Sequence, residues 1–263
     1  MITVGSLFSG IGGLDLGLEQ AGMKTVWQVE FDDWARGKLD ENFPHTEKFK
    51  DVREVGKHNL RPVDLICGGF PCTNVSNVNH HTRTGIDGEK SGLWMEQFRI
   101  FCELRPRYAL IENVPGLITS GGFRRVLSDL ASVGYDAEWQ TFRAASFGLS
   151  SERKRLFIIA YPHSVGLVQN EIFNSGNHKI NIPRPFPFGQ YRVSVEAARR
   201  SYPQIPEHLR MDNGLSFELS EIEAAIKGYG NAVCPPVARF IGERIIEFDQ
   251  ERNEIGDSNE TNN

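Results

Sequence analysis

Four side chains that could take part in catalysis lie at the ends of hydrophobic stretches of this chain. Cys72 follows Gly-Gly-Phe-Pro after one stretch, Glu112 ends a second, and Arg153 and Arg155 precede a third. A thiol, a carboxyl group and a guanidinium at one edge of a sheet could attack an unsaturated ring, hold a proton and stabilise developing charge. These residue types therefore indicate nucleophilic catalysis.

Cys72 also has a simpler interpretation. Free cysteines are usually small buried hydrophobic residues, and we interpret Cys67, Cys102 and Cys234 in this way. Cys72 differs because it follows a strand at the carboxyl edge, where open α/β sheets bind their ligands. A thiol at this edge becomes nucleophilic if backbone donors or cations lower its pKa, although no partner histidine is evident nearby in the sequence. Position alone leaves both interpretations open.

Glu112 and the two arginines have similar alternatives. Glu112 could be a helix cap or a solvated carboxylate, but in a partly apolar setting at the same edge its pKa would rise and it could share a proton. Arg153 and Arg155 occupy alternate positions, so they would point the same way if the following strand begins early. A surface salt bridge is the alternative for them.

A glycine-rich turn, Phe8-Ser9-Gly10-Ile11-Gly12-Gly13, follows the first hydrophobic stretch. A dinucleotide-binding fingerprint would need glycine where Asp15 stands, so that kind of site is excluded. Gly10 and Gly12 still let a ligand approach the backbone, and Glu30, at the end of the second stretch, could accept hydrogen bonds from ribose hydroxyls. The pattern fits an adenosyl ligand without a pyrophosphate; a turn needed only for packing is the alternative.

The segments that must position these residues alternate between short apolar runs typical of strands and the longer amphipathic spacing typical of helices. Strands are predicted at Thr3–Phe8, Thr25–Glu30, Val63–Cys67, Tyr108–Glu112, Glu138–Arg143 and Leu156–Ala160. Amphipathic helices are predicted at Gly12–Ala21, Asp33–Asn42, Leu93–Leu104 and Phe123–Val133. This alternation predicts an α/β fold, a Rossmann-like and mostly parallel sheet covered by helices on both faces.

The pattern changes after residue 160. Residues 161–227 are rich in Asn, Pro, Gly and aromatic residues, which predicts a small irregular lobe. A last helix is predicted from Pro235 to about Gln250, since proline suits its first turn, and the polar tail 250–263 is expected to be disordered. The catalytic domain would then comprise residues 1–160 and 228–249.

Composition limits the class of protein. The chain has 263 residues, of which 40% are hydrophobic, enough for one buried domain with a small lobe. Its net charge is −5, but basic residues concentrate between positions 143 and 210, where a polyanion could bind. The cysteine spacing suggests neither zinc nor disulfides. We find no apolar run long enough for a membrane and no signal peptide, and therefore expect a cytoplasmic protein.

Five motifs in a fixed order resemble those of the bacterial and phage DNA (cytosine-5)-methyltransferases. They are Phe8–Gly13, Pro71-Cys72, Glu112-Asn113-Val114, Arg153-x-Arg155 and Gly230-Asn231-x-Val233. The resemblance covers residues 1–160 and 228–249. In that family the segment between them is the target-recognition region, which coincides with the irregular lobe at 161–227.

The resemblance implies a methyl transfer from S-adenosylmethionine to carbon 5 of a flipped-out cytosine in double-stranded DNA, by a monomer without a metal. S-adenosylhomocysteine would be the product. Cys72 would be the nucleophile, Glu112 would hold the ring nitrogen and amino group, Arg155 the ring oxygen, and Arg153 would support them. The cofactor would be bound by Phe8, Gly10, Gly12, Glu30, Phe31, Asp51, Asn231, Ala232 and Val233.

Two departures from the family pattern concern the loop that would close over the base. Thr73 stands where the family usually has Gln after Pro-Cys, and the Gln expected before Arg-x-Arg is replaced around Ser151 and Glu152. The polar stretch Thr73–Gly92 is the candidate closing loop. The target sequence and the biological role, restriction partner or otherwise, stay open.

Two other functions are compatible with parts of this pattern. A methyltransferase acting on transfer RNA would carry a Cys-Phe-Thr tripeptide, which this chain lacks. A non-catalytic DNA-binding relative would be expected to have lost Cys72 or Glu112.

Overall fold

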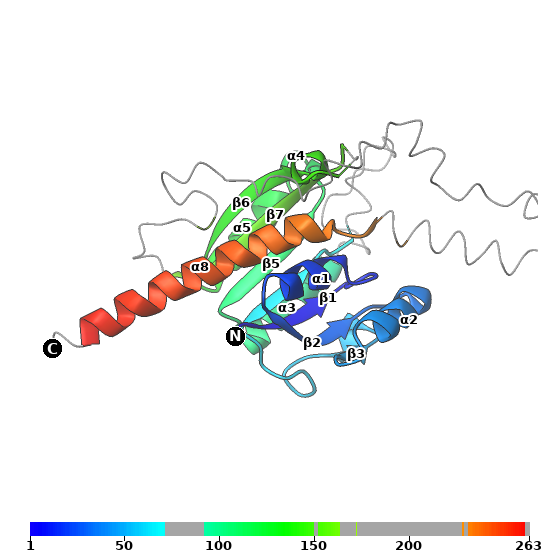
Figure 1. The fold of residues 1–263 in the computed structure, drawn as a ribbon, viewed down its shortest axis with the longest axis horizontal. Helices are drawn as coiled ribbons and strands as arrows, with labels where there is room; N and C mark the ends of the chain where they lie inside the picture. Colours follow the sequence, from blue (N-terminus) through cyan, green and yellow to red (C-terminus); the bar gives the residue numbers. More distant parts are fainter. Residues whose placement is uncertain (72–91, 150–151, 164–171, 173–227, 229–230, 261–263) are drawn as a thin grey trace, which may run out of the picture.

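A computed structural model describes residues 1–71, 92–149, 152–163, 172, 228 and 231–260, with side chains up to residue 252. The described residues form one seven-stranded sheet in the order β3-β2-β1-β4-β5-β7-β6 (Figure 1). Its strands are β1 (Thr3–Leu7), β2 (Lys24–Val29), β3 (Glu47–Phe49), β4 (Leu65–Gly68), β5 (Tyr108–Asn113), β6 (Tyr135–Arg143) and β7 (Lys154–Pro162).

The first five strands are parallel to one another, whereas β7 runs antiparallel to both β5 and β6. The predicted mostly parallel sheet is therefore confirmed, with an antiparallel hairpin at one side. Because β7 is reversed, its first residues lie at the edge where β1, β4 and β5 end.

Helices follow the parallel strands and cover the sheet. They are α1 (Gly13–Gln20), α2 (Asp33–Asn42), α3 (Gly92–Leu104), α4 (Gly116–Thr119), α5 (Gly122–Ser132) and α8 (Pro235–Glu260), with short 3-10 helices η1 (Val52–Glu54) and η3 (Ala144–Phe147). The predicted bounds of α2 are confirmed, and its N-terminus is capped by Asp32, whose carboxylate accepts the backbone N–H groups of Trp34 and Ala35.

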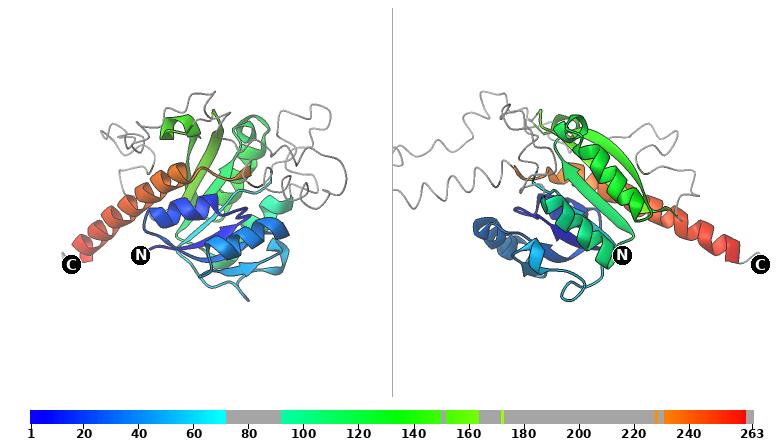
Figure 2. Two further views of the ribbon diagram at one scale, coloured as in Figure 1. Left: turned by 45° about the vertical axis from the view of Figure 1, so that its right-hand side comes forward. Right: turned by 180° about the vertical axis from the view of Figure 1, so that it is seen from behind.

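Two hydrophobic cores lie on opposite faces of the sheet because successive strand side chains alternate in direction. On β5, Ala109 and Ile111 face the core formed with α3 and α5, while Tyr108 and Leu110 face the core formed with α1 and α8. Figure 2 shows α3 and α5 on the opposite side of the sheet from α8. The expectation of helices on both faces is thus confirmed.

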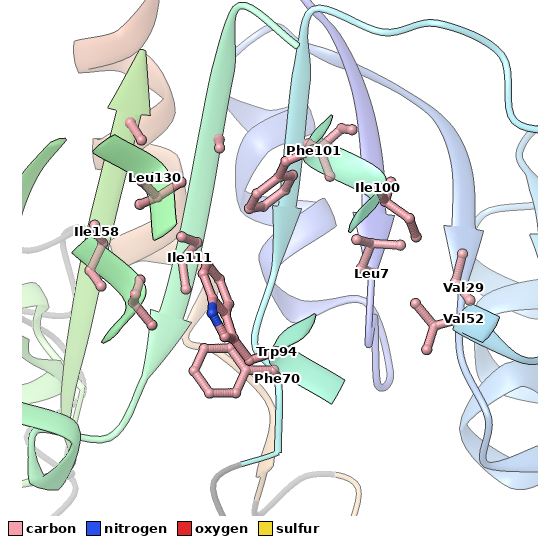
Figure 3. Close-up of a cluster of buried hydrophobic side chains, with 14 of the residues drawn as sticks. Leu7, Val29, Val52, Phe70, Trp94, Ile100, Phe101, Ile111, Leu130 and Ile158 are labelled. Carbon is pink, nitrogen blue, oxygen red and sulfur yellow. The ribbon is translucent and has the colours of Figure 1, made fainter. Parts of the chain in front are cut away.

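The core under α3 is built around aromatic residues. Trp94 of α3 is fully buried, and its ring centroid lies 5.3 Å from that of Phe70, just after β4 (Figure 3). The indole N–H donates to the carboxylate of Asp129 on α5 at 2.8 Å, so the buried polar atom of the tryptophan is satisfied. This packing anchors the end of β4, which precedes Cys72.

Some predicted bounds were wrong. β6 begins at Tyr135 and β7 at Lys154, earlier than expected, because the two strands pair along their whole length. The short strand β3 was not predicted. The irregular lobe at 161–227 lies almost entirely outside the described residues. No helix among the described residues is long and apolar enough to cross a membrane.

The last helix continues to Glu260 instead of ending near Gln250, so the expected start of a disordered tail at residue 250 was wrong. The helix is fixed to the sheet near Gln250. The carboxylate of Asp249 accepts hydrogen bonds from Tyr108 at 2.9 Å and from Arg107 at 3.0 Å.

Small residues let α8 pack closely on α1, the helix that follows the glycine turn. A Cβ atom on Gly17 would lie 2.4 Å from both the Cβ of Ala238 and the carbonyl oxygen of Pro235. A Cβ on Gly242 would similarly lie 2.8 Å from that of Ala21. The C-terminal helix is therefore held against the element that begins at the glycine turn.

We predict that Gly17→Ala destabilises the protein by about 1 to 3 kcal/mol, because the added methyl group would overpack the contact with α8. Urea unfolding measures this. Gly37→Ala is the matched control: Gly37 lies inside α2 with no atom near its missing Cβ, so alanine should stabilise by about 0.5 to 1 kcal/mol. Equal effects of the two substitutions would contradict the close packing.

Candidate active site

β5 and β7 bring a carboxylate and a guanidinium together at the carboxyl edge of the parallel strands. Asn113 at the end of β5 pairs with Leu156 near the start of β7. Arg155, one residue before Leu156, therefore lies beside Glu112, and its Nε is 2.9 Å from Oε1 of the carboxylate. The two side chains that the sequence placed at this edge are in contact.

The surroundings of Glu112 shift the pKa of its carboxyl group. Its side chain is only 13% exposed, and burial raises the pKa of the carboxyl group, while the positive charges of Arg155 and Arg153 oppose the rise. Arg155 is the partner of Oε1, and no further hydrogen bond to this oxygen is formed by the described residues. Glu112 is thus a carboxyl group that takes up a proton more readily than an exposed glutamate while it stays paired with Arg155.

Glycine is required where β4 ends beside this carboxylate. A Cβ atom on Gly69 would lie 2.6 Å from Oε2 of Glu112. Any other residue at position 69 would therefore push the carboxylate or the strand end away. The Gly-Gly pair after β4 lets the two strand ends approach each other.

Asn113 fixes the backbone that leads to Cys72. Its Nδ2 donates to the carbonyl oxygen of Phe70 at 3.2 Å, and its Oδ1 accepts the N–H of Val114 at 2.9 Å. Asn113 is itself buried. Cys72 lies outside the described residues, but the chain two residues before it is held to the strand that carries Glu112.

Arg153 connects the same edge to the C-terminal segment. Its Nη2 donates to the carbonyl oxygen of Asn231 at 2.7 Å. Burial and the neighbouring charge of Arg155 lower the pKa of its guanidinium. Its positive charge also acts on Glu112, although its Nη2 donates to the C-terminal segment.

The glycine turn adopts the left-handed backbone that its glycines permit. Gly10 and Gly12 have φ values of 56° and 85°, and Phe8 also has a positive φ of 53°. A Cβ on Gly12 would in addition lie 2.3 Å from the ring of Phe43. The backbone therefore favours glycine at both positions, and at Gly12 the ring of Phe43 also leaves no room for a side chain.

Glu30 holds this turn in place. Its Oε2 accepts the N–H of Gly10 at 2.7 Å and its Oε1 accepts the N–H of Asp32 at 2.8 Å. A carboxylate has about four acceptor positions, so each oxygen can still accept a further hydrogen bond from a ligand. Sequence reasoning predicted Glu30 as a ligand-binding residue but missed its contact with the turn.

Two further predicted cofactor residues lie near the ends of β2 and β3. The ring of Phe31 is 62% exposed, with Nζ of Lys50 5.7 Å from its centroid. Asp51 caps η1 by accepting the N–H of Arg53 at 3.0 Å. Phe31 thus presents an open aromatic face, whereas Asp51 already has a structural partner.

The predicted residues Asn231, Ala232 and Val233 lie next to the glycine turn. A Cβ atom on Gly13 would be 2.3 Å from the carbonyl oxygen of Val233. Among the described residues, the structure therefore gathers the expected residues into two neighbouring groups: Glu112 with the arginines, and the turn with Glu30 and Val233.

Sequence reasoning missed three residues with roles at this edge. Asn113 and Gly69 were noted only as parts of motifs, and Asp15 only as the residue that breaks a dinucleotide fingerprint. The position of Asn113 directly after Glu112 could have indicated a residue that fixes the strand end.

Comparison with known proteins agrees with this arrangement. The profile of the C-5 cytosine-specific DNA methylase family matches residues 2–201. Type II methyltransferase M.Bsp6I of Bacillus sp. (strain RFL6) is 34% identical over 167 residues, covering 61% of this chain and 52% of the relative. Type II methyltransferase M2.BsuMI of Bacillus subtilis (strain 168) is 37% identical over 162 residues, covering 59% and 41%. The chain spans about half the length of the curated relatives that it matches.

Solved structures share the fold. A candidate DNA modification methyltransferase encoded within a prophage (E. coli) is 30% identical, with a TM-score of 0.53, and the match covers 63% of this chain and 48% of that one. The Entamoeba histolytica methyltransferase EhMeth has the same TM-score of 0.53 at 20% identity, covering 61% of this chain and 53% of that one. Since the family profile spans β1 to β7, the chain belongs to the C-5 cytosine-specific DNA methylase family.

Proposed function

We propose that this protein transfers a methyl group from S-adenosylmethionine to carbon 5 of a cytosine in double-stranded DNA. The observation that carries the proposal is the buried Glu112 in contact with Arg155, at the strand edge next to the segment that leads to Cys72. A carboxyl group with a raised pKa and a fixed guanidinium match the ring nitrogen, amino group and oxygen of cytosine. Family membership supports the same reaction.

The residues around the glycine turn fit an adenosyl cofactor. The turn leaves space at Gly10, where nothing lies near the missing Cβ, Glu30 has spare acceptor positions for ribose hydroxyls, and Phe31 offers an exposed ring for the adenine. Asp51 and Asn231 to Val233 would complete the pocket. When bound, S-adenosylmethionine supplies an electrophilic methyl group for carbon 5.

Cys72 would act as the nucleophile in this reaction. Its thiolate adds to carbon 6 of the cytosine, and the electron pair of the 5,6 double bond becomes available at carbon 5. After carbon 5 is methylated, loss of its proton re-forms the double bond and expels the thiolate. The cysteine is therefore regenerated in each turnover.

Glu112 and Arg155 would stabilise the ring while Cys72 is attached. Addition at carbon 6 increases negative charge on the ring nitrogen and oxygen. A protonated Glu112 can donate to the nitrogen while its other oxygen accepts from the amino group, and Arg155 can donate to the ring oxygen. Arg153 adds positive charge and links this group to the segment at Asn231.

The cytosine must leave the duplex to reach these groups, at a cost of a few kcal/mol. A closing element would therefore be needed, and residues 73–92 are the candidate, although most of them lie outside the described residues. Labelled-methyl transfer to duplex DNA and to transfer RNA tests the substrate class. Transfer to RNA alone, or to neither, would contradict the proposal.

We predict that Cys72→Ala abolishes methyl transfer but leaves cofactor affinity nearly unchanged, because the sulfur takes part only in the attack on the base. Calorimetry and a labelled-methyl assay measure the two effects. Cys102→Ala, which changes a cysteine on α3 away from the site, is the control and should keep its activity. DNA containing 5-fluorocytosine should trap the wild-type protein covalently when S-adenosylmethionine is present, because fluorine cannot leave carbon 5 as a proton does; absence of an adduct in the correct sequence context would contradict the role of Cys72.

We predict that Glu112→Gln lowers kcat by about 10²- to 10⁴-fold, because glutamine cannot supply a proton to the ring. Since the pKa of Glu112 is raised, the protonated form becomes scarcer as pH rises through it, so the ratio of wild-type to variant rate should fall with rising pH. Glu152→Gln is the control: Glu152 is 82% exposed near the same edge. A pH-independent ratio would contradict proton donation.

We predict that Glu30→Ala weakens cofactor binding by about 1.5 to 3 kcal/mol for each charge-assisted hydrogen bond lost. The loss should exceed that of Glu30→Gln, which keeps one acceptor oxygen for Gly10 or the ribose. Calorimetric titration with S-adenosylhomocysteine measures it. Glu41→Ala, an exposed change on α2, is the control and should bind normally; if Glu30→Ala bound equally well, the pocket would have to lie elsewhere.

A further inference from the structure

Asp15 is a fully buried carboxylate directly after the glycine turn, and the reaction described above does not use it. It lies in the first turn of α1. Its Oδ1 accepts a hydrogen bond from Nε2 of Gln28 at 2.8 Å, and its Oδ2 accepts one from Oγ of Ser6 at 3.1 Å. All three side chains are at most 1% exposed. A buried charge needs such partners, but burying it is still costly.

The hydrogen bonds continue from Asp15 in both directions. Oγ of Ser9, within the glycine turn, lies 2.9 Å from Oγ of Ser6. On the other side, Oγ1 of Thr46 donates to Oε1 of Gln28 at 2.7 Å. A continuous buried chain thus connects the turn, β1, α1, β2 and the residue before β3.

The negative charge of Asp15 sets the direction of these hydrogen bonds. A carboxylate only accepts, so Ser6 and Gln28 must both donate to it. The single hydroxyl proton of Ser6 is then used, so its oxygen can only accept. Ser9 donates to it at 2.9 Å, and the carbonyl oxygens of Ser6 and Val29 lie farther from the Ser9 hydroxyl, at 3.3 and 3.5 Å. The amide of Gln28 must likewise turn its oxygen to Thr46. If Asp15 is neutral, Ser6 and Gln28 no longer have to donate to it. The direction of the hydrogen bonds between Asp15 and the glycine turn is then no longer fixed.

Burial makes the charge of Asp15 costly for the fold. Burial raises the pKa of Asp15 from 3.8 to about 6. Because the folded value is higher, ionised Asp15 reduces stability as pH rises from 3.8 to about 6. The titratable groups that act on it or face it are Glu19 on α1 and Cys67 on β4; its partners on β1 and β2, Ser6 and Gln28, are uncharged.

We propose that Asp15 is a positioning residue for the cofactor: through Ser6 its carboxylate holds Ser9, and with it the glycine turn, in the arrangement that binds the adenosyl ligand. This rests on the proposed function, since it assumes that the turn binds S-adenosylmethionine. Cofactor affinity and the stability of the fold should therefore respond differently to loss of this charge. Loss of the charge weakens cofactor binding without weakening the fold.

Asp15→Asn tests this, because asparagine has the same shape but carries no charge. Wild type and variant are titrated with S-adenosylhomocysteine by calorimetry from about pH 5 to about pH 8, and their thermal unfolding is followed in the same buffers. At the upper pH we expect about tenfold weaker binding by the variant, the effect of about one hydrogen bond. Its Tm should be equal to or higher than that of wild type.

At the lower pH, protonation neutralises Asp15 in the wild type, so the two affinities should converge. The ratio of the two affinities is the quantity to compare at each pH, because protonation of S-adenosylhomocysteine affects both proteins equally. His45→Gln serves as a control because Nε2 of His45 lies 2.9 Å from Oε1 of Glu19, whose charge acts on Asp15. His45→Gln should keep the wild-type pH profile.

Two results would overturn the proposal while leaving the proposed function intact: wild-type affinity in Asp15→Asn at the upper pH, or an affinity ratio that does not change with pH. A lower Tm with unchanged affinity would assign Asp15 to the fold alone. If the wild-type protein bound no S-adenosylhomocysteine at any pH, the proposed function and this proposal would both fail.

Discussion

The site depends on the antiparallel direction of β7. In an all-parallel sheet, the residues that precede a strand lie at the edge opposite to the carboxyl ends of its neighbours. The reversal of β7 instead places Arg155 beside Glu112, with Asn113 and Leu156 in register. The carboxylate and its cation therefore meet because of topology, and the Gly69 backbone then approaches close enough to exclude any larger residue.

Much of the fold could be predicted from the sequence because its elements have clear periodicity. The strands before α1, α2 and α5, and the bounds of α2, follow from local patterns of apolar residues. What could not be predicted depends on contacts distant in sequence. The full length of β6 and β7 comes from their pairing, and the place where α8 meets the sheet depends on the contact of Asp249 with Tyr108, which lies far away in the chain.

The candidate site shows the same division. Motifs identified Glu112, Arg155 and Glu30 by residue type and position at strand ends. They could not indicate that Glu30 already binds the N–H of Gly10, since a residue's partners within the fold are not encoded in a motif. The role of Asn113 toward Phe70 was equally hidden, because both are buried only once β4 and β5 pair.

The two buried carboxyl groups, Glu112 and Asp15, belong to different parts of the site. Glu112 lies beside the arginines, and Asp15 lies behind the glycine turn. Burial raises the pKa of Glu112, which is surrounded by arginines, and that of Asp15, which is surrounded only by neutral donors. Arginine charge can offset the penalty for Glu112, whereas for Asp15 hydrogen bonds alone must do so. The charge of Asp15 is best understood through what it orders, the backbone turn in front of it.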